Sequence, residues 1–142
     1  DALLAEQLQL FLDVHLRMGW ADFQRLACSL SFDPDFYAAN MHRLLGPNGP
    51  WKELEAKVDI HRRFIDASLA HDAIGALASV TVPALIMHAG RDIVTGPRVT
   101  RPIEEALPNA RGLDFPEAAH VLAGKTLRQR FSEELFAFFG SV

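Results

Sequence analysis

Apolar and polar residues alternate with a helical period through the first half of the chain. Over residues 3–18 the apolar positions recur at spacings of three and four, which predicts one stripe along a helix. The stripe consists of Leu4, Leu8, Phe11, Leu12 and His15. A second helix is predicted over 20–32, after a break at Gly19. A third is predicted over 34–45, between the start signal Asp33-Pro34 and the stop at Gly46. One long amphipathic helix over 51–70 and a short helix over 71–80 complete the first half.

The spacing of apolar residues changes at Val80. "VPALIMHAG" (82–90) is a short continuous apolar run, as expected of a strand buried on both faces of a parallel sheet. A helical pattern over 96–108 that ends at Pro108, a second strand over 110–115 and an amphipathic helix over 125–140 follow. Strand, helix, strand, helix is an α/β crossover pattern, so the two strands should be parallel neighbours. Because two such apolar strands cannot face water alone, further strands must come from elsewhere.

Composition and charge narrow the classes of protein. A chain of 142 residues with 49% hydrophobic residues can bury a core, and a net charge of −4 argues against a nucleic-acid partner. The basic runs at 61–63 and 128–130 are interpreted as solvated helix faces. A single cysteine, Cys28, excludes an internal disulfide and favours a small core residue.

The ends and the apolar runs of the chain bear on its location. No apolar run approaches the length of a membrane span and no signal peptide is visible, so we expect a cytoplasmic protein. The chain begins "DALLAEQ" without an initiator methionine, which favours a processed product, an excised piece or a subunit numbered after cleavage.

An acid and a histidine follow the two predicted strands. Asp92 comes directly after the first strand and His120 lies in the loop after the second. Functional groups in open parallel sheets gather in the loops beyond the carboxyl ends of strands. We therefore expect a ring nitrogen of His120 within hydrogen-bonding distance of the Asp92 carboxylate, which would orient the imidazole as a base. The competing interpretation is a turn aspartate and a loop histidine without a shared role.

The stretch "VTVPALIMHAGRDIVTGP…EEALPNARGLDFPEAAHVLAG…FSEELFAFF", within residues 80–139, resembles the C-terminal end of an α/β-hydrolase. The resemblance implies that Asp92 is the triad acid and His120 the triad base. It also implies an α/β fold in which residues 1–79 form a helical cap and residues 80–142 form the C-terminal β-α-β-α part of the hydrolase sheet. The chain departs from the family pattern at Ala89 and Ala119, where glycine is usual.

The first half of such an enzyme is not found in the sequence. A nucleophile elbow reads G-x-S-x-G between a strand and a helix, and no serine stands in that pattern. Ser29, Ser31, Ser68 and Ser79 all lack the flanking glycines of such an elbow. An oxyanion-hole loop is absent as well. The fold is therefore expected to be incomplete without an N-terminal half, supplied by a cleaved or separate chain that carries the serine.

Other candidate residues have weaker patterns. His15, His42, His61 and His71 lie on predicted helices without metal-ligand spacing, so structural or surface roles are favoured and no metal is expected. His88 is expected to pack at the end of a strand, and Asp114 is the second candidate for the acid. Part of the aromatic and methionine set of the first half would line an apolar substrate cleft if it is a cap. Those substrate-binding candidates are Trp20, Phe23, Phe36, Tyr37 and Met41.

These features favour the C-terminal part of a serine-type hydrolase that cleaves a small apolar ester, lactone or thioester without a cofactor. Carbon–carbon bond hydrolysis and acyl transfer to an acceptor other than water stay open within the same resemblance. The alternative from another class is a non-catalytic α/β-hydrolase-like module that binds a ligand or a protein.

Overall fold

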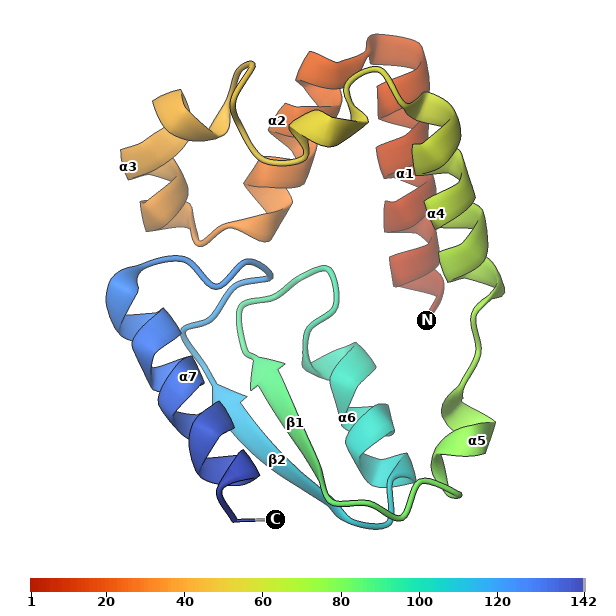
Figure 1. Cartoon of the computed structure of the whole chain (residues 1–142). Helices are drawn as coiled ribbons and strands as arrows, with labels where there is room; N and C mark the ends of the chain where they lie inside the picture. The colour runs from red at the N-terminus through yellow and green to blue at the C-terminus, as the bar shows by residue number, and fades with distance from the viewer. Residues whose placement is uncertain (142) are drawn as a thin grey trace. The chain divides into compact units, whose positions relative to one another are not determined.

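The computed structural model describes residues 1–141. The chain divides into two compact units, Asp1–His71 and Asp72–Val142. The first unit is helical, and the second contains a small parallel sheet (Figure 1). The sequence had placed the boundary at residue 79. Residues 72–79 instead belong to the second unit, because the short helix α5 (Ile74–Leu77) packs against α6 (Pro97–Ala106).

The first unit follows the predicted helical periods closely. Its helices are α1 (Ala2–Met18), α2 (Trp20–Ser31), α3 (Pro34–Leu44) and α4 (Val58–Ala70), with a 3-10 turn, η1 (Lys52–Leu54), before α4. The break at Gly19 is confirmed, with a positive φ of 90° that glycine adopts without strain. The helix start at Asp33 is confirmed too, since its side chain accepts the N–H groups of Asp35 and Phe36.

The long helix predicted over 51–70 is wrong in its first third. Residues 52–54 form the 3-10 turn and the α-helix begins only at Val58. Of the segment 52–57, Leu54 is half-buried and the other side chains are exposed. A stretch without an apolar face gains nothing from packing, and the left-handed backbone of Trp51 (φ 59°) is incompatible with an α-helix that starts at this residue.

The core of the first unit lies where α1 packs against α2 and α4. Its apolar members include Leu12, Phe23, Ala27, Cys28 and Ile65. A buried amide, Gln24, ties α2 to the following loop by donating to the carbonyls of Gly46 and Pro50 and accepting the Gly46 N–H. This polar anchor holds the 46–50 turn against the helices.

The second unit has the predicted β-α-β-α order. Strands β1 (Ala84–Ala89) and β2 (Ala110–Phe115) pair in parallel, and helices α6 (Pro97–Ala106) and α7 (Lys125–Phe139) follow them (Figure 1). Side-chain alternation assigns the helices to opposite faces. His88 and Gly112 face Glu104 of α6, whereas Phe115 contacts Phe131 of α7. The unit therefore has three layers, helix, sheet and helix.

Arg130 fastens α7 to the end of β2. Its guanidinium lies 4.4 Å over the Phe115 ring, and it donates to the Glu117 carboxylate at 2.7 Å and to the Asp114 carbonyl at 3.1 Å. The run at 128–130 is therefore not simply a solvated face. The run at 61–63 differs as well, since His61 is buried in the first unit. Within the described residues, no helix combines the length and apolar character that crossing a bilayer requires.

Candidate active site

The loops after β1 and β2 are bonded to each other at the carboxyl edge of the sheet. The Gly90 N–H donates to the Phe115 carbonyl at 2.9 Å, and the Arg91 N–H donates to the Ala118 carbonyl at 2.8 Å. A β-carbon on Gly90 would come within 2.7 Å of Pro116 Cα, so a side chain there would push the loops apart. Gly90 thus allows the close approach that brings Asp92 near His120.

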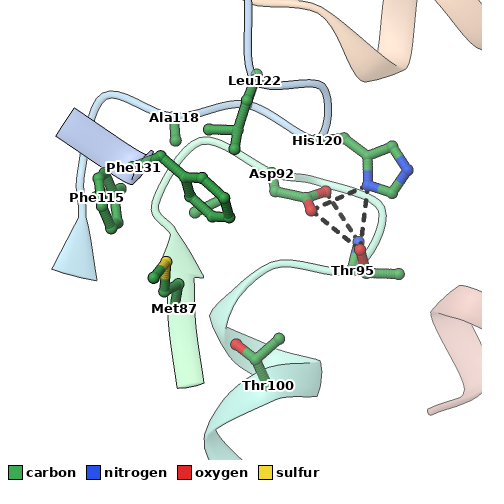
Figure 2. Close-up of a pocket in the computed structure, with 11 residues that line it drawn as sticks. Met87, Asp92, Thr95, Thr100, Phe115, Ala118, His120, Leu122 and Phe131 are labelled. Carbon is green, nitrogen blue, oxygen red and sulfur yellow. Dashed lines mark hydrogen bonds and ion pairs between the residues drawn. The ribbon is translucent and has the colours of Figure 1, made fainter. Parts of the chain in front are cut away.

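The Asp92 carboxylate is almost fully buried and uses both oxygens. Oδ1 accepts the N–H groups of Val94 at 2.7 Å and Thr95 at 2.9 Å. Oδ2 accepts the Thr95 hydroxyl at 3.0 Å and lies 3.0 Å from His120 Nδ1 (Figure 2). Burial alone would raise the pKa of Asp92, but the bonds from His120 and from the Thr95 and Val94 N–H groups outweigh it and lower the pKa to about 2. The carboxylate is therefore ionised at neutral pH.

His120 is held through one ring nitrogen and leaves the other exposed. Because an ionised carboxylate only accepts hydrogen bonds, Nδ1 carries the proton that faces Asp92. In the neutral ring Nε2 then has a free lone pair, and Figure 2 shows it pointing away from the carboxylate. The side chain is 34% exposed, so Nε2 can reach a reactant. The predicted hydrogen bond between Asp92 and His120 is present, and it gives the arrangement of a base oriented by an acid.

The Asp92 loop is braced from outside by α6. Arg98 donates to the carbonyls of Ile93 at 3.0 Å and Val94 at 2.7 Å, so the loop is held by its carbonyls as well as by its N–H groups. Gly96 lies so close that a β-carbon on it would sit 2.0 Å from the Asp92 carbonyl oxygen. The carboxylate is thereby positioned before any ligand arrives.

A cavity of about 220 Å³ opens beside the acid–histidine pair. Its wall is mainly apolar, and its polar groups include those of Asp92, Thr95 and His120 (Figure 2). The apolar lining includes Met87, Phe115, Leu122 and Phe131. A polar pair at the rim of an apolar hollow is typical of a small-molecule site.

No model of a protein family matches the sequence, and no curated protein sequence matches it. Among solved structures, the crystal structure of MGS-M2, an alpha/beta hydrolase enzyme from a Medee basin deep-sea metagenome library, superposes with a TM-score of 0.83 at 21% sequence identity. The match covers 96% of this chain. The chain has the fold of part of an α/β-hydrolase. It spans 50% of the MGS-M2 chain, as expected of a partial fold.

Within residues 1–141, no serine hydroxyl is hydrogen-bonded to His120. The hydroxyls of Ser29 and Ser68 donate to carbonyls of their own helices, that of Ser79 donates to the Ala76 carbonyl, and Ser31 is buried in the first unit. The contacts of His120 in this part of the chain are to Asp92 and Thr95. The acid and the base of the expected triad are adjacent, while a nucleophile is not among the described residues.

The other titratable candidates of the second unit, Asp114 and His88, bond to residues of α6. Asp114, the second candidate for the acid, is paired with Arg101 on the α6 face of β2. His88 is fully buried and contacts Glu104 and Thr100 of α6, each at 2.7 Å, which agrees with the expected packing role. Across residues 1–141 no group of three or more histidine, cysteine or acidic side chains is arranged to hold a metal ion.

The histidines of the first unit and Cys28 occupy the predicted structural or surface positions. His15 and His61 are buried against each other, whereas His42 and His71 are exposed. Burial raises the pKa of the Cys28 thiol to about 11, and Sγ donates to the Leu44 carbonyl at 3.7 Å. A thiol held in its protonated form is a poor nucleophile.

The substrate-binding candidates all lie in the first unit, in different environments. Phe23 is 3% exposed in the helical core, against Trp20 and the two histidines. Phe36 stacks on Phe32 with ring centroids 5.7 Å apart, Tyr37 is half-buried, and Met41 is 49% exposed. Their role in binding a substrate stays a prediction.

Sequence reasoning missed Thr95, whose hydroxyl contacts both members of the pair. The available signal was its position three residues after Asp92 in "DIVT", where a threonine can bond back to the aspartate that starts the turn.

Proposed function

We propose that the chain is the C-terminal part of a serine-type α/β-hydrolase that cleaves a small apolar ester, lactone or thioester. The observation that supports this proposal is the hydrogen-bonded pair of Asp92 and His120, with Nε2 of the ring left free at the carboxyl edge of the strands. The acid–base geometry suits acyl transfer, and the fold is one that carries such chemistry.

In the proposed reaction, a serine supplied by the absent half attacks the carbonyl carbon. His120 Nε2 takes the hydroxyl proton as the new carbon–oxygen bond forms, and the resulting imidazolium returns that proton to the leaving group. Water then attacks the acyl-enzyme with the same exchange of protons. Asp92 stays ionised throughout, because its pKa of about 2 lies far below neutral pH, and it stabilises the imidazolium.

The partner of this proposal is an N-terminal hydrolase half, cleaved or separately encoded, that provides the serine and the oxyanion donors. The open side of the two-stranded sheet supports it, since unpaired strand edges are normally covered in folded proteins. The apolar lining beside His120 favours an apolar acyl group, and a substrate-binding role for Trp20 and Phe36 is part of the same proposal. A cytoplasmic location is part of the same proposal.

The test joins the chain to the coding sequence that lies upstream of it and follows hydrolysis of a short-chain p-nitrophenyl ester. We expect turnover in the assembled protein and a loss of roughly 10⁴-fold for His120→Gln or Asp92→Asn, the scale on which triad members act. Asp114→Asn is the matched control, because this carboxylate is paired with Arg101 and should leave the rate unchanged.

Three outcomes would contradict the proposal. Retained activity in His120→Gln would remove this residue from the mechanism. Ester hydrolysis by the unassembled chain would refute the need for a second half. A ligand that binds to the assembled protein without turnover would favour the non-catalytic binding module.

A further inference from the structure

The side chain of Thr95 contacts both the acid and the base. Its hydroxyl oxygen lies 3.0 Å from Asp92 Oδ2 and 3.1 Å from His120 Nδ1, so the three groups form a closed triangle (Figure 2). The role of this hydroxyl goes beyond the Asp92–His120 pair that the α/β-hydrolase resemblance implies.

We propose that Thr95 is a positioning residue, whose hydroxyl fixes the Asp92 carboxylate and the His120 ring in one mutual orientation. A catalytic consequence of this positioning depends on the proposed function. The hydrogen-bond geometry itself does not, because all three residues belong to this chain. Thr95 does not touch the reacting atoms, because Nε2 of His120 points the other way.

The direction of each hydrogen bond follows from the charges. The carboxylate can only accept, so the single hydroxyl proton of Thr95 goes to Oδ2 and leaves the oxygen lone pairs directed at His120. Nδ1–H then has two acceptors, the Asp92 carboxylate and the Thr95 hydroxyl. An unprotonated Nδ1 would direct a lone pair at an ionised carboxylate, so the triangle selects the ring form with a free Nε2.

Two contacts also limit motion that one contact would allow. His120 lies in the loop between β2 and α7, where neither helix nor strand fixes its backbone, and its side chain is 34% exposed. A single bond to Oδ2 permits the ring to swing about that atom, while a second partner defines its plane. For the carboxylate, Oδ1 is held by two N–H groups, and the Thr95 hydroxyl gives Oδ2 a second bond beside that of His120.

Only the hydroxyl of Thr95 is under test, because the backbone N–H that donates to Oδ1 remains with any side chain except proline. Thr95→Val removes the hydroxyl at nearly constant volume, and Thr95→Ser restores it. Thr126→Val, at an exposed position of α7, is the matched control for a threonine-to-valine change.

The experiment uses nuclear magnetic resonance on the full chain, with His120 and Asp92 assigned through His120→Gln and Asp92→Asn. In Thr95→Val we expect the Nδ1 proton of His120 to exchange with water roughly tenfold faster, the change that matches loss of one hydrogen bond. The carboxyl carbon of Asp92 should titrate about one pH unit higher. Thr95→Ser and Thr126→Val should both behave like the parent protein.

The outcomes separate this inference from the proposed function. Unchanged exchange and titration in folded Thr95→Val would overturn the positioning role, and so would a Thr95→Ser variant that behaves like Thr95→Val. If Thr95→Val is unfolded by circular dichroism, the Thr95→Ser result still decides, since it must match the parent. None of these readouts requires turnover, so an assembled protein without hydrolase activity would refute the proposed function and leave the positioning role standing.

Discussion

The buried carboxylate of Asp92 is stabilised by its partners more than it is destabilised by leaving water. Its side chain is 6% exposed, yet bonds from His120, Thr95 and Val94 hold its pKa at about 2, below the ordinary 3.8. A lowered folded-state pKa means that the stabilisation is complete above the unfolded-state value. It is lost as the pH falls from about 4 toward 2.

The first prediction concerns the contribution of the Asp92 carboxylate to stability. Asp92→Asn should lower the free energy of unfolding at pH 7 by about 2 kcal/mol, since one pKa unit corresponds to about 1.4 kcal/mol. The variant should also lose less stability than the parent protein between pH 5 and pH 2. Urea unfolding at a series of pH values measures both effects. Asp114→Asn, at a side chain 58% exposed, is the control and should change little. Parallel pH profiles for Asp92→Asn and the parent would contradict the assignment.

At the scale of elements, α1 and α4 meet through two buried histidines. His15 Nδ1 and His61 Nδ1 are 2.9 Å apart. The two residues are 3% and 5% exposed, respectively. One ring donates its Nδ1 proton and the other accepts it through an unprotonated Nδ1, so the bond requires that the accepting ring is neutral. His15 Nε2 is buried and has no hydrogen-bond partner within residues 1–141. Phe23 and Trp20 of α2 enclose the pair.

The second prediction is that mild acid loosens the packing of α1 on α4. Burial, and next the neighbouring His15, lower the pKa of His61 below its ordinary 6.5. The unfolded chain therefore binds the proton first, and stability falls as the pH drops below 6.5 toward the lowered value. Unfolding monitored by Trp20 fluorescence between pH 7 and pH 5 measures this change.

Leucine variants give the control for the histidine pair. The double variant His15→Leu with His61→Leu should show a flatter profile over that pH range. His15→Leu alone should cost about 1–3 kcal/mol, because His61 Nδ1 loses its partner while it stays buried. A double variant with the same acid sensitivity as the parent would place the titrating group elsewhere.

A second interface between elements, α6 against the sheet, depends on Gly112. A β-carbon there would come 2.1 Å from Glu104 Oε1, the carboxylate that bonds to His88 at 2.7 Å. The absence of a side chain on β2 therefore leaves the space in which Glu104 reaches the buried ring.

The third prediction is that Gly112→Ala displaces Glu104 and destabilises the second unit. The cost should be about 1–3 kcal/mol, the penalty for a buried polar atom, His88 Nε2, left without its partner. Thermal unfolding measures it. Gly75→Ala in α5 is the matched control, since nothing lies within 4 Å of its added β-carbon. Equal effects of the two substitutions would refute the steric argument.

At the scale of the whole molecule, the two strands differ in the kind of edge they present. β2 carries Arg111 and Asp114 on its exposed surface, and charges are typical of an edge strand. β1 ("ALIMHA") carries no acid, lysine or arginine, as expected of a strand with neighbours on both sides. The N-terminal half that we propose as the partner should therefore pair with β1.

The fourth prediction identifies the amides that would make this pairing. The N–H groups of Ala84 and Gly90 donate toward β2, so by alternation those of Leu85, Met87 and Ala89 point to the open side. Amide hydrogen exchange should be fast at these three residues in the chain alone and slow after assembly with the N-terminal half. Ile86 and His88 are the internal controls, protected in both states. Unchanged exchange at the open side after assembly would place the missing half against another surface.

The sequence by itself determined the elements and the pairing at the site. The bounds of β2, the parallel crossover, the breaks at Gly19 and Gly46 and the meeting of Asp92 with His120 depend on local periodicity and on the general rule that parallel strands end at one edge. The partial α/β-hydrolase fold was readable for the same reason, since its final strands and helices follow one another directly along the chain.

Only the tertiary structure decided which polar groups become partners. The bond between His15 and His61 joins residues 46 positions apart, and His88 meets Glu104 only because Gly112 leaves room on a third element. The late start of α4, at Val58, and the contact of Thr95 with His120 were decided in the same way. Periodicity assigns a residue to a face, but a hydrogen bond needs two atoms about 3 Å apart in a suitable direction, and only the packed arrangement of elements sets that distance.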